Sequence, residues 1–593
     1  MNIWTRTNSK GTTVEWIRES VRIGCKVTTK YLHNVTGMSD AEKEALLKYY
    51  KGCINEEHPF CSGLLYGSSE YDPLSGISDG HVNAVLTAME HLGLMEIISL
   101  QPCPERDVIA ALVVLRIIDP MSKYSTRVLF KTTSVGLRLH LLDCSLDRIY
   151  RAMDWVLTRK TDIESQLVRR HISDGSIVFV DVSSSYYEGE RSLKFDRHGQ
   201  ERETGCELPR MDYSRDKKKG KTQINYAQTT DMYGRPLRID IYPGNISDYS
   251  TFMPSVDVLL ECGIKNFTIV GDRGEISGKD IILIQSQYEG IHYISALRAA
   301  SLHKIIKDSP KPLNEFVERD LFEFVSVEFP NDRLIACRNP DERQEREKTR
   351  DSLIKDTTKF FDEIKSRVIS GSLRDIKTIG EAVGEAKNKR NVAKYFQTEW
   401  GEGHFDYSLK QDIIDKEKLL DGVFVVRTSL PFELMDPEEC VRRYKDLALV
   451  DRGFRSKKSI DLRVRPIFHF ADDRIRSHIF IVMLAEYVLW HMKTAWRPLT
   501  FADPEQELKA NRNPALKPPK SDTAKNKEST GMVDATAEAM SFQNVLNTLA
   551  CSNYHFVVSG TGGSKTKTLV RTPVTPYELR ALALLEGIRK TGK

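Results

Sequence analysis

With 593 residues, 40% of them hydrophobic, the chain is long enough to bury more than one core, so about two to four domains are expected. Lys and Arg (87) nearly balance Asp and Glu (83), so the net charge of +4 excludes a uniformly basic protein. A nucleic-acid partner must therefore be sought in local charge clusters. No apolar run reaches the roughly 18 residues of a membrane span, and the first residues lack a signal-peptide core. The ten cysteines include no CxxC pair and are expected to be reduced thiols of a cytosolic protein.

The first part of the chain predicts two regions. Residues 1–60 are expected to form a small α/β region, and residues 61–172 a helical domain whose apolar residues recur at helical spacing. Basic residues recur through this helical domain: Lys123, Arg127, Lys131, Arg138, Arg148, Arg151, Arg159 and Lys160. A cationic helical surface could bind DNA, and an ordinary solvated charged face fits these residues equally well.

A different pattern begins near Ser176. Short runs rich in β-branched and apolar residues predict strands at 177–182, 222–229, 236–242, 267–271 and 292–297, with a helix over 249–262. This alternation predicts a mixed α/β sheet over residues 173–300, completed by the helices of residues 437–500.

Residues 301–436 interrupt that pattern. A hairpin over 321–338, a Lys/Glu-rich helix from 341 and strands at 404–409 and 423–428 indicate an insertion domain. The last region, 501–593, is expected to hold a mobile connector at 502–533, rich in Lys, Asn and Pro, followed by a strand at 554–558 and a helix at 576–589.

Two aspartates occur where a predicted strand gives way to polar residues. Asp181 follows Ile-Val-Phe-Val, and Asp272 follows Phe-Thr-Ile-Val-Gly. A carboxylate in an apolar strand loses hydration unless it is paired or binds a cation, and Mg²⁺ prefers oxygen ligands of this kind. Each Asp could instead cap a turn or pair with a nearby Arg.

A third acid occurs in the helical segment that begins at Tyr444. Asp451 and Arg455 are one helical turn apart, and Lys458 lies about one turn further on. A carboxylate followed by cations suits a site that holds both metal and phosphate. An amphipathic surface helix with internal ion pairs has the same pattern.

These segments together resemble a known family. The stretches that carry the resemblance are VFVDVSSSYYEG around Asp181, IDIYPGNISD (239–248), VGDRG around Asp272, DGVFVVRT (421–428), LVDRGFRSKKSIDLRVRPIFHF (449–470) and RIRSHIF (474–480). In this order they are similar to insertion-sequence DDE transposases that have a ribonuclease-H-like catalytic core and a β-rich insertion before the third acid. The resemblance implies an enzyme that cleaves DNA strands and transfers them to target DNA with two Mg²⁺ ions, or with Mn²⁺ in their place.

The resemblance also implies roles for single residues. Asp181, Asp272 and Asp451 fall at the positions of the three acids that catalyse the reaction and bind the metal, and we hypothesise that Asp181 bridges both ions. Tyr444 and Lys458 fall at the Tyr and Lys positions of the family's Tyr–Arg–Glu–Lys pattern.

Two positions depart from that pattern. Leu447 stands at the Arg position, and Asp451 at the Glu position is shorter by one methylene, about 1.5 Å. Asp451 ligates a metal if its helix lies closer to the sheet; otherwise the enzyme is weak or inactive. Glu486 is an alternative acid outside the pattern.

The expected partner is double-stranded DNA, at the element ends and at the target, bound by a homodimer in the prokaryotic cytoplasm near the nucleoid. The residues expected to contact DNA are Tyr444, Arg455, Lys458, Lys217, Lys218 and Lys219. Three other classes are considered: an inactive transposase-derived DNA-binding protein, a nuclease that cleaves without joining, and a purely structural protein. The last leaves the two strand-borne aspartates unexplained.

Overall fold

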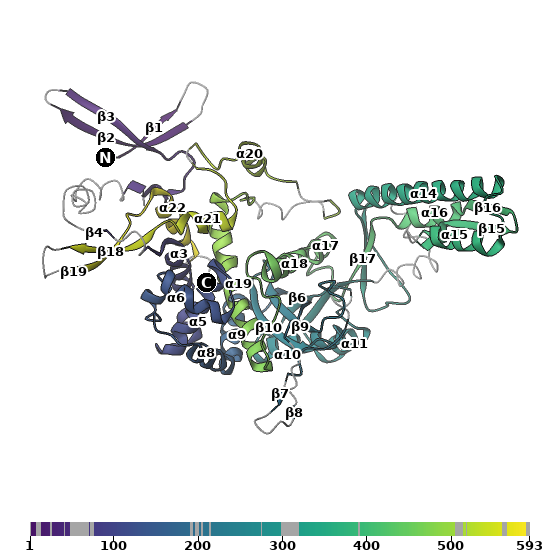
Figure 1. The fold of residues 1–593 in the computed structure, drawn as a ribbon, viewed down its shortest axis with the longest axis horizontal. Coiled ribbons are helices and arrows are strands. Elements are labelled where there is room, and N and C mark those ends of the chain that lie inside the picture. The colour runs from purple at the N-terminus through teal and green to yellow at the C-terminus, as the bar shows by residue number, and fades with distance from the viewer. Residues whose placement is uncertain are drawn as a thin grey trace.

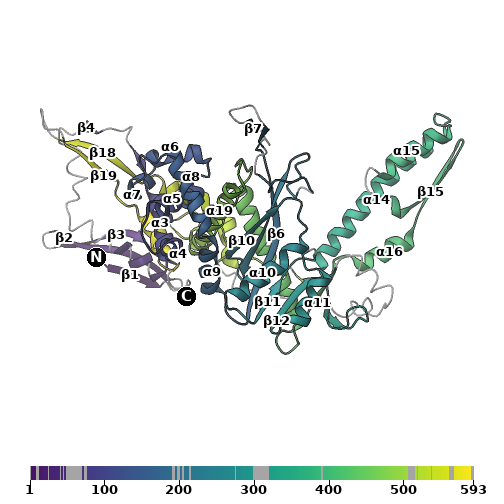
Figure 2. The same ribbon diagram turned by 90° about the horizontal axis from the view of Figure 1, so that it is seen from below.

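The computed structural model describes residues 2–588 except for a set of short segments: 8–12, 24–25, 41, 45, 48–69, 72–75, 190–193, 196–200, 203–205, 213–214, 274, 298–319, 389–391, 505–513, 517–518, 536 and 560–565. A central sheet lies between a helical block and a projecting segment, as Figure 1 and Figure 2 show from two directions.

The central sheet has eight strands and is mixed. Its strands are β6 (Ser176–Tyr186), β9 (Gln223–Asp231), β10 (Pro236–Pro243), β11 (Phe267–Val270), β12 (Ile291–Ala296), β13 (Leu321–Phe324), β14 (Arg333–Arg338) and β17 (Val423–Thr428). They lie in the order β10-β9-β6-β11-β12-β17-β14-β13. β11 is parallel to β6 and β12, and the other neighbouring pairs are antiparallel. The prediction of a mixed α/β architecture is therefore confirmed.

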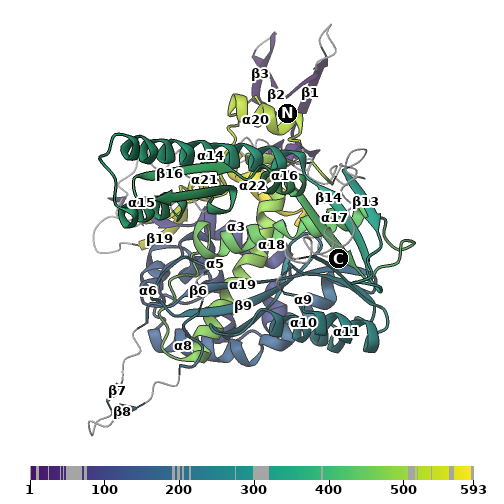
Figure 3. The ribbon, with the colours of Figure 1, turned by 90° about the vertical axis from the view of Figure 1, so that its right-hand side faces the viewer.

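Helices cover both faces of this sheet. α10 (Tyr249–Glu261) packs on β6 and α11 (Gly278–Gln287) on β12. α18 (Ala448–Arg455) also packs on β6, and α17 (Pro437–Asp446) packs on β12 and β17. Figure 1 and Figure 3 show α17 and α18 on the side of the sheet opposite α10 and α11. Because β6 is covered on both sides, its middle residues are buried, which favours the β-branched run that the sequence has there.

A helical block precedes the sheet in the chain. Its helices are α3 (Gly80–His91), α4 (Leu94–Ile98), α5 (Pro104–Ile118), α6 (Lys123–Thr132), α7 (Val135–Arg138), α8 (Leu146–Thr158) and α9 (Lys160–His171). The long helix α19 (Asp472–Ala495) packs on α3, α5 and α8 and also on β10, so it joins the block to the sheet. No helix in the described residues combines the length and apolarity that a bilayer-crossing segment needs.

Both ends of the chain lie near this block. β1 (Asn2–Thr7), β2 (Thr13–Ile23) and β3 (Lys26–Asn34) form an antiparallel sheet. The C-terminal elements are α20 (Asp522–Thr530), α21 (Phe542–Leu549), β18 (Asn553–Ser559), β19 (Thr566–Arg571) and α22 (Pro576–Leu585). β18 pairs with β19 and with β4 (Glu70–Tyr71) and β5 (Ile77–Ser78), and α21 and α22 pack on α3. The C-terminal region is therefore packed with the helical block.

The projecting segment, residues 340–422, forms a unit of its own. It contains α14 (Pro340–Ile369), α15 (Ile376–Asn388), β15 (Phe396–Gly401), β16 (His404–Leu409) and α16 (Gln411–Leu420), and Figure 2 shows it extending away from the sheet. Phe361 is at the centre of its separate hydrophobic cluster and contacts the rings of Phe396 and Phe405 at 5.0 and 5.7 Å.

The structure differs from the predicted insertion in two ways. β13, β14 and β17 lie within the predicted insertion 301–436 but pair with the central sheet, because β17 adds to β12 and β14 adds to β17. The remaining part, 340–422, is mainly helical rather than β-rich, with only β15 and β16 as strands among its described residues. The Lys/Glu-rich composition of α14 explains this, since those residues favour helix over strand.

The predicted connector at 502–533 also differs, although residues 505–513 and 517–518 lie outside the described residues. It contains α20, which begins at a side-chain cap from Ser521. The Nζ of Lys527 is buried and donates hydrogen bonds to the carbonyls of Arg497 (2.9 Å) and Thr500 (3.0 Å). These bonds hold α20 against the end of α19, so that part of the connector has a fixed position.

Candidate active site

Asp181 and Asp272 lie at the same edge of the sheet because their strands are parallel. The register pairs Phe179 of β6 with Val270 of β11, so each aspartate lies two residues beyond this pair. β6 continues through Asp181, which pairs with Gln228 of β9, whereas β11 ends at Val270. Asp181 is therefore half-buried inside a strand, and Asp272 is exposed at the start of a turn.

Glu275 holds the two strands together at this edge. Its buried carboxylate accepts a hydrogen bond from the backbone N–H of Val182 (2.8 Å) and another from the backbone N–H of Asp272 (3.1 Å). The Val182 N–H also donates to the Asp181 carboxylate (2.8 Å). One carboxylate thus fixes the backbone beside both predicted acids. The sequence analysis missed Glu275, whose only signal was an acid three residues after Asp272.

Negative charge accumulates around Asp181. Burial, the largest cause, and the neighbouring carboxylates of Asp451 and Asp272 together raise the pKa of Asp181 to about 6. Burial and the adjacent Asp181 likewise raise the pKa of Glu275 well above its usual range. Because the carboxylates of Asp272 and Asp451 both raise the pKa of Asp181, the three predicted acids share one electrostatic environment.

Asp451 reaches this edge from α18, but not from one continuous helix as the sequence suggested. The chain is helical through Asp446, bends at Leu447 and continues as α18, so Tyr444 and Asp451 lie on two helices. Leu447 packs against the hydrophobic core. An apolar side chain at that position therefore has a structural reason.

Two glycines allow α18 to lie close to its neighbours. A Cβ at Gly453 would lie 2.9 Å from Oε1 of Glu486 on α19, and a Cβ at Gly234, in the β9–β10 turn, would lie 2.8 Å from the Cβ of Leu449. Both distances are too short for a real Cβ contact. The Glu486 carboxylate is buried and held by an ion pair with Lys457, so a larger residue at either glycine would push α18 outward. The position of α18 is important for Asp451. An Asp side chain is shorter than the Glu of the pattern that the sequence resembles, so its helix must lie closer to the sheet.

Tyr444 contacts one of the acids directly. Its hydroxyl donates a 2.9 Å hydrogen bond to Oδ1 of Asp272. Burial and the Asp272 carboxylate raise the pKa of the Tyr444 hydroxyl, so it remains a donor at neutral pH. Tyr444, which was expected to contact DNA, therefore also orients Asp272.

Glu486, the alternative third acid, is engaged elsewhere. It is buried and forms an ion pair with the fully buried Lys457 (2.9 Å), which also donates to the side chain of Gln228. Burial raises the pKa of Glu486, and Lys457 acts in the opposite direction. Asp451, and not Glu486, is among the largest causes of the shift in the Asp181 pKa. This difference favours Asp451 over Glu486 as the candidate third acid.

Lys458 lies in a π-helical turn (Ser456–Ile460) rather than on a continuation of α18. Its Nζ pairs with the buried Asp216 carboxylate at 3.1 Å, and Arg465 pairs with the same carboxylate. Burial lowers the pKa of Lys458, and Asp216 opposes that shift. Lys458 is thus paired with an acid inside the protein, and its expected contact with DNA phosphate remains a prediction.

The Lys217–Lys219 run is positioned by the same aspartate. Asp216 also accepts a hydrogen bond from the backbone N–H of Tyr186 at the end of β6 (3.2 Å). The three lysines that follow are exposed, and Lys218 lies over the Tyr186 ring at 5.6 Å. Arg455 is exposed on α18, one turn after Asp451. These cations lie beside the acidic edge of the sheet.

The donor set has the chemistry of a magnesium site, since every group is a carboxylate oxygen. The repulsion that raises the pKa of Asp181 is also the environment that a cation would relieve. Within the described part of the chain, however, no group of three or more His, Cys, Asp or Glu side chains is arranged so that it could hold an ion. Metal binding would therefore require these side chains to move closer together.

Comparison with known proteins adds little. No family model matches the sequence, and no curated protein matches it. Among solved structures, a piggyBac transposase synaptic complex with hairpin DNA aligns over 82% of this chain and 82% of that chain, at 9% sequence identity and a TM-score of 0.34. Values this low do not establish a common fold.

Proposed function

We propose that this protein is a DDE-type transposase that cleaves DNA at the ends of an insertion sequence and transfers the strands to target DNA. The observation that carries the proposal is that two carboxylates from separate elements, Asp272 and Asp451, both raise the pKa of a third, Asp181. Asp181 comes from β6, Asp272 from the end of β11 and Asp451 from α18, and the latter two act electrostatically on the first.

We infer that the core is ribonuclease-H-like. The inference is supported by five neighbouring strands that lie in the order β10-β9-β6-β11-β12. β6, β9 and β10, which come first in the chain, pair antiparallel. β11 is parallel to β6, and β12 is parallel to β11. The first acid lies on the middle strand of these five and the second follows its parallel neighbour. Open sheets that contain parallel strands commonly carry their sites at the carboxyl ends of those strands.

Asp181, Asp272 and Asp451 would hold the divalent ions, with Mg²⁺ as the natural ion and Mn²⁺ as its substitute. Such ions would supply charge neutralisation to a phosphodiester that undergoes in-line displacement. The side chains of this protein supply the orientation: Glu275 fixes the backbone of Asp272 and Val182, and Tyr444 orients the Asp272 carboxylate. Arg455 and Lys217–Lys219 would contact the DNA backbone beside the acids.

The test uses a plasmid that carries the gene together with its own flanking DNA, since the element ends lie there if the proposal is right. Incubated with Mg²⁺ and a target plasmid, the wild-type protein should release the element and produce joined strands. Asp181→Asn and Asp272→Asn should abolish both products while DNA binding is retained. Asp257→Asn, an exposed aspartate on α10, is the matched control and should retain both.

The other outcomes separate the alternatives. Cleavage without joined products would identify a nuclease, and DNA binding without cleavage would identify an inactive transposase-derived protein. The second alternative has specific support, because Asp451 is one methylene short and the three acids are not arranged to hold an ion. Undiminished cleavage by Asp181→Asn would refute the proposed site.

A further inference from the structure

The helical block carries a cationic surface that is far smaller than its sequence suggested. Of its basic residues in 123–160, one is buried and others are paired with acids: Lys123 is buried, and Arg138, Arg151, Arg159 and Lys160 pair with Asp79, Asp147, Asp162 and Glu164. Arg127, Lys131 and Arg148 remain, and in the described residues none of these three forms a salt bridge. Two of the three lie on α6.

The outward face of α6 combines these cations with apolar and aromatic side chains. Tyr124 is 69% exposed and Val128 is 60% exposed, and Arg127 and Lys131 are also exposed. The four residues recur at helical spacing and so share one face. The opposite face, with Thr126 and Phe130, is buried. A large exposed tyrosine and valine between two cations is unusual for a face that contacts only water.

The charged residues along α6 and its flanking loops, from 120 to 142, have one sign. The sequence from 120 to 142 contains no Asp or Glu, although acids make up 83 of the 593 residues of the chain. A surface of unpaired cations without acids is complementary to a polyanion rather than to a typical protein surface.

α6 follows α5 after a short connection and is fixed at both of its ends. It begins five positions after the end of α5, and the four residues 119–122 form the connection. Ser122 caps α6 by accepting a hydrogen bond from the N–H of Ser125 (3.1 Å). At the other end, Gly136 of α7 lies against α6, since a Cβ there would be 1.9 Å from the Phe130 carbonyl oxygen. A connection of four residues between two helices, with an exposed face on the second, matches the connection length of a helix-turn-helix motif.

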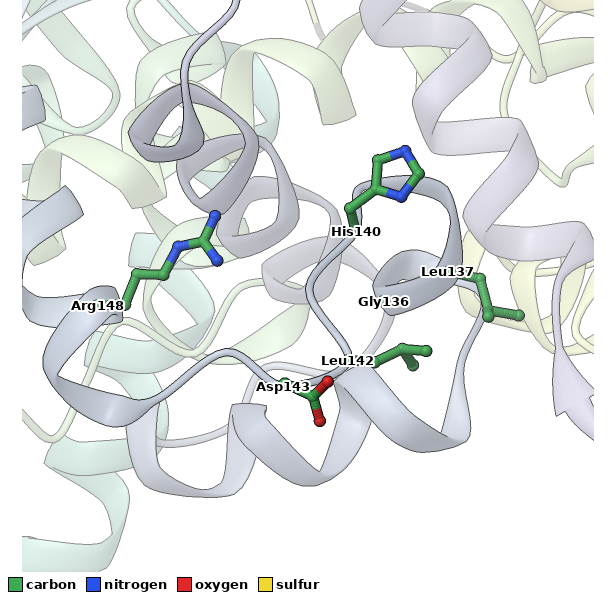
Figure 4. A pocket seen from close by; sticks show the side chains of 6 residues that line it. All are labelled: Gly136, Leu137, His140, Leu142, Asp143 and Arg148. Atoms are coloured by element: carbon green, nitrogen blue, oxygen red, sulfur yellow. The ribbon is translucent and has the colours of Figure 1, made fainter.

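A hollow of about 310 Å³ adjoins the end of α7 (Figure 4). Figure 4 shows Arg148 reaching toward it from α8 and His140 from the loop after α7, and Asp143 is the one acid in its lining. Burial raises the pKa of the Cys144 thiol, and Arg148 and Arg127 both act to lower it. Arg148, the third unpaired cation, is therefore close to Arg127 and extends the cationic surface of α6.

We propose that α6 is a recognition helix that enters the major groove of duplex DNA. Arg127 and Tyr124 would contact base edges, Val128 would contact a thymine methyl group, and Lys131 and Arg148 would contact phosphates on either side. The proposal takes duplex DNA as partner from the proposed function but uses none of the acidic residues. It therefore assigns sequence recognition to a surface separate from the cleavage site.

The test measures binding alone, with the full chain carrying Asp181→Asn so that no cleavage intervenes. Duplexes that bind this protein are selected from a random-sequence pool, and the enriched sequence is compared with a scrambled duplex. Arg127→Ala and Tyr124→Ala should each weaken binding to the enriched duplex by about tenfold or more, while binding to the scrambled duplex changes much less. Lys131→Ala should weaken both equally and reduce the salt dependence by about one phosphate contact.

Arg346→Ala on α14, an exposed arginine far from α6, is the matched control and should leave both affinities unchanged. Thermal unfolding checks each variant, and Ala on an exposed helix face is not expected to destabilise the fold. Equal loss of affinity for both duplexes by Arg127→Ala, or failure of the protein to enrich any sequence, would overturn the recognition helix. Neither result would bear on whether the acidic residues cleave DNA.

Discussion

The hydroxyl of Tyr444 donates a 2.9 Å hydrogen bond to the carboxylate of Asp272, across 172 positions of the sequence. The bond links α17, which leads into the third-acid helix, to the strand end that carries the second acid. The bond orients the Asp272 carboxylate.

Removing that hydroxyl should slow cleavage without weakening DNA binding. A hydrogen bond to a charged group contributes about 1.5–3 kcal/mol, so Tyr444→Phe should lower the cleavage rate roughly tenfold or more. The rate of strand nicking at saturating DNA measures this effect. Tyr407→Phe is the matched control, because Tyr407 donates to Asp362 at 2.5 Å in the projecting segment. If both variants nick DNA at the wild-type rate, Tyr444 has no positioning role.

The close packing of α18 should determine whether Asp or Glu at position 451 supports faster cleavage. Gly453→Ala should push α18 away from Glu486 and reduce cleavage by Asp451. Adding Asp451→Glu to that variant should restore part of the activity, because the longer side chain spans the added distance, whereas Asp451→Glu alone should reduce activity. The DNA nicking rates of the three variants, compared with the wild-type rate, test this expectation. A faster rate for Asp451→Glu alone would mean that the helix is not close enough for Asp.

The buried pair of Lys457 and Glu486 should be structural. Lys457→Met leaves Glu486 as an unpaired buried charge, so the free energy of unfolding should fall by about 3–5 kcal/mol. The double variant Lys457→Met with Glu486→Leu should recover most of that loss in a urea titration. It should also retain cleavage. Loss of cleavage by a double variant with normal stability would instead make Glu486 the third acid.

Two histidines, the half-buried His171 and the buried His491, should make the protein sensitive to acid. Burial, the largest cause, and the nearby Arg235 together lower the pKa of His171 to about 3 and that of His491 to about 2. An unfolded histidine titrates near 6.5, so below that pH the unfolded state binds protons that the folded state does not. Stability is therefore fully present above about 6.5 and is lost as the pH falls toward 3.

His491→Phe should reduce this loss, because Nε2 of His491 has no hydrogen-bond partner among the described residues and a phenyl ring fills a similar space. At about 1.4 kcal/mol for each pH unit below 6.5, the decrease between pH 7 and pH 5 should shrink by about 2 kcal/mol. Urea titrations at the two pH values measure it. The same decrease in wild type and variant would contradict the assignment.

Local sequence patterns predicted much of the core. The β-branched run at 177–182 lies within β6, and the strands expected at 404–409 and 423–428 have the bounds of β16 and β17. The two strand-borne aspartates were found because a carboxylate in an apolar run is costly to bury. Their parallel register then places them at one edge.

What the sequence could not predict depends on contacts between distant segments. The pairing of β17 with β12 spans more than a hundred residues, so β13, β14 and β17 were assigned to the insertion. The ion pair of Lys458 was not foreseen because its partner, Asp216, lies 242 positions away. Glu275 was missed because its role is to accept backbone hydrogen bonds from two strands, which no spacing pattern reveals.

The most direct test of the central claim is a calorimetric titration of the full-length protein with Mn²⁺ in the absence of DNA. Asp181, Asp272 and Asp451 should act as one set of ligands, so Asp181→Asn, Asp272→Asn and Asp451→Asn should each abolish the binding that wild type shows, and Asp257→Asn should retain it. Wild-type binding that survives all three substitutions would place the metal elsewhere and contradict the account.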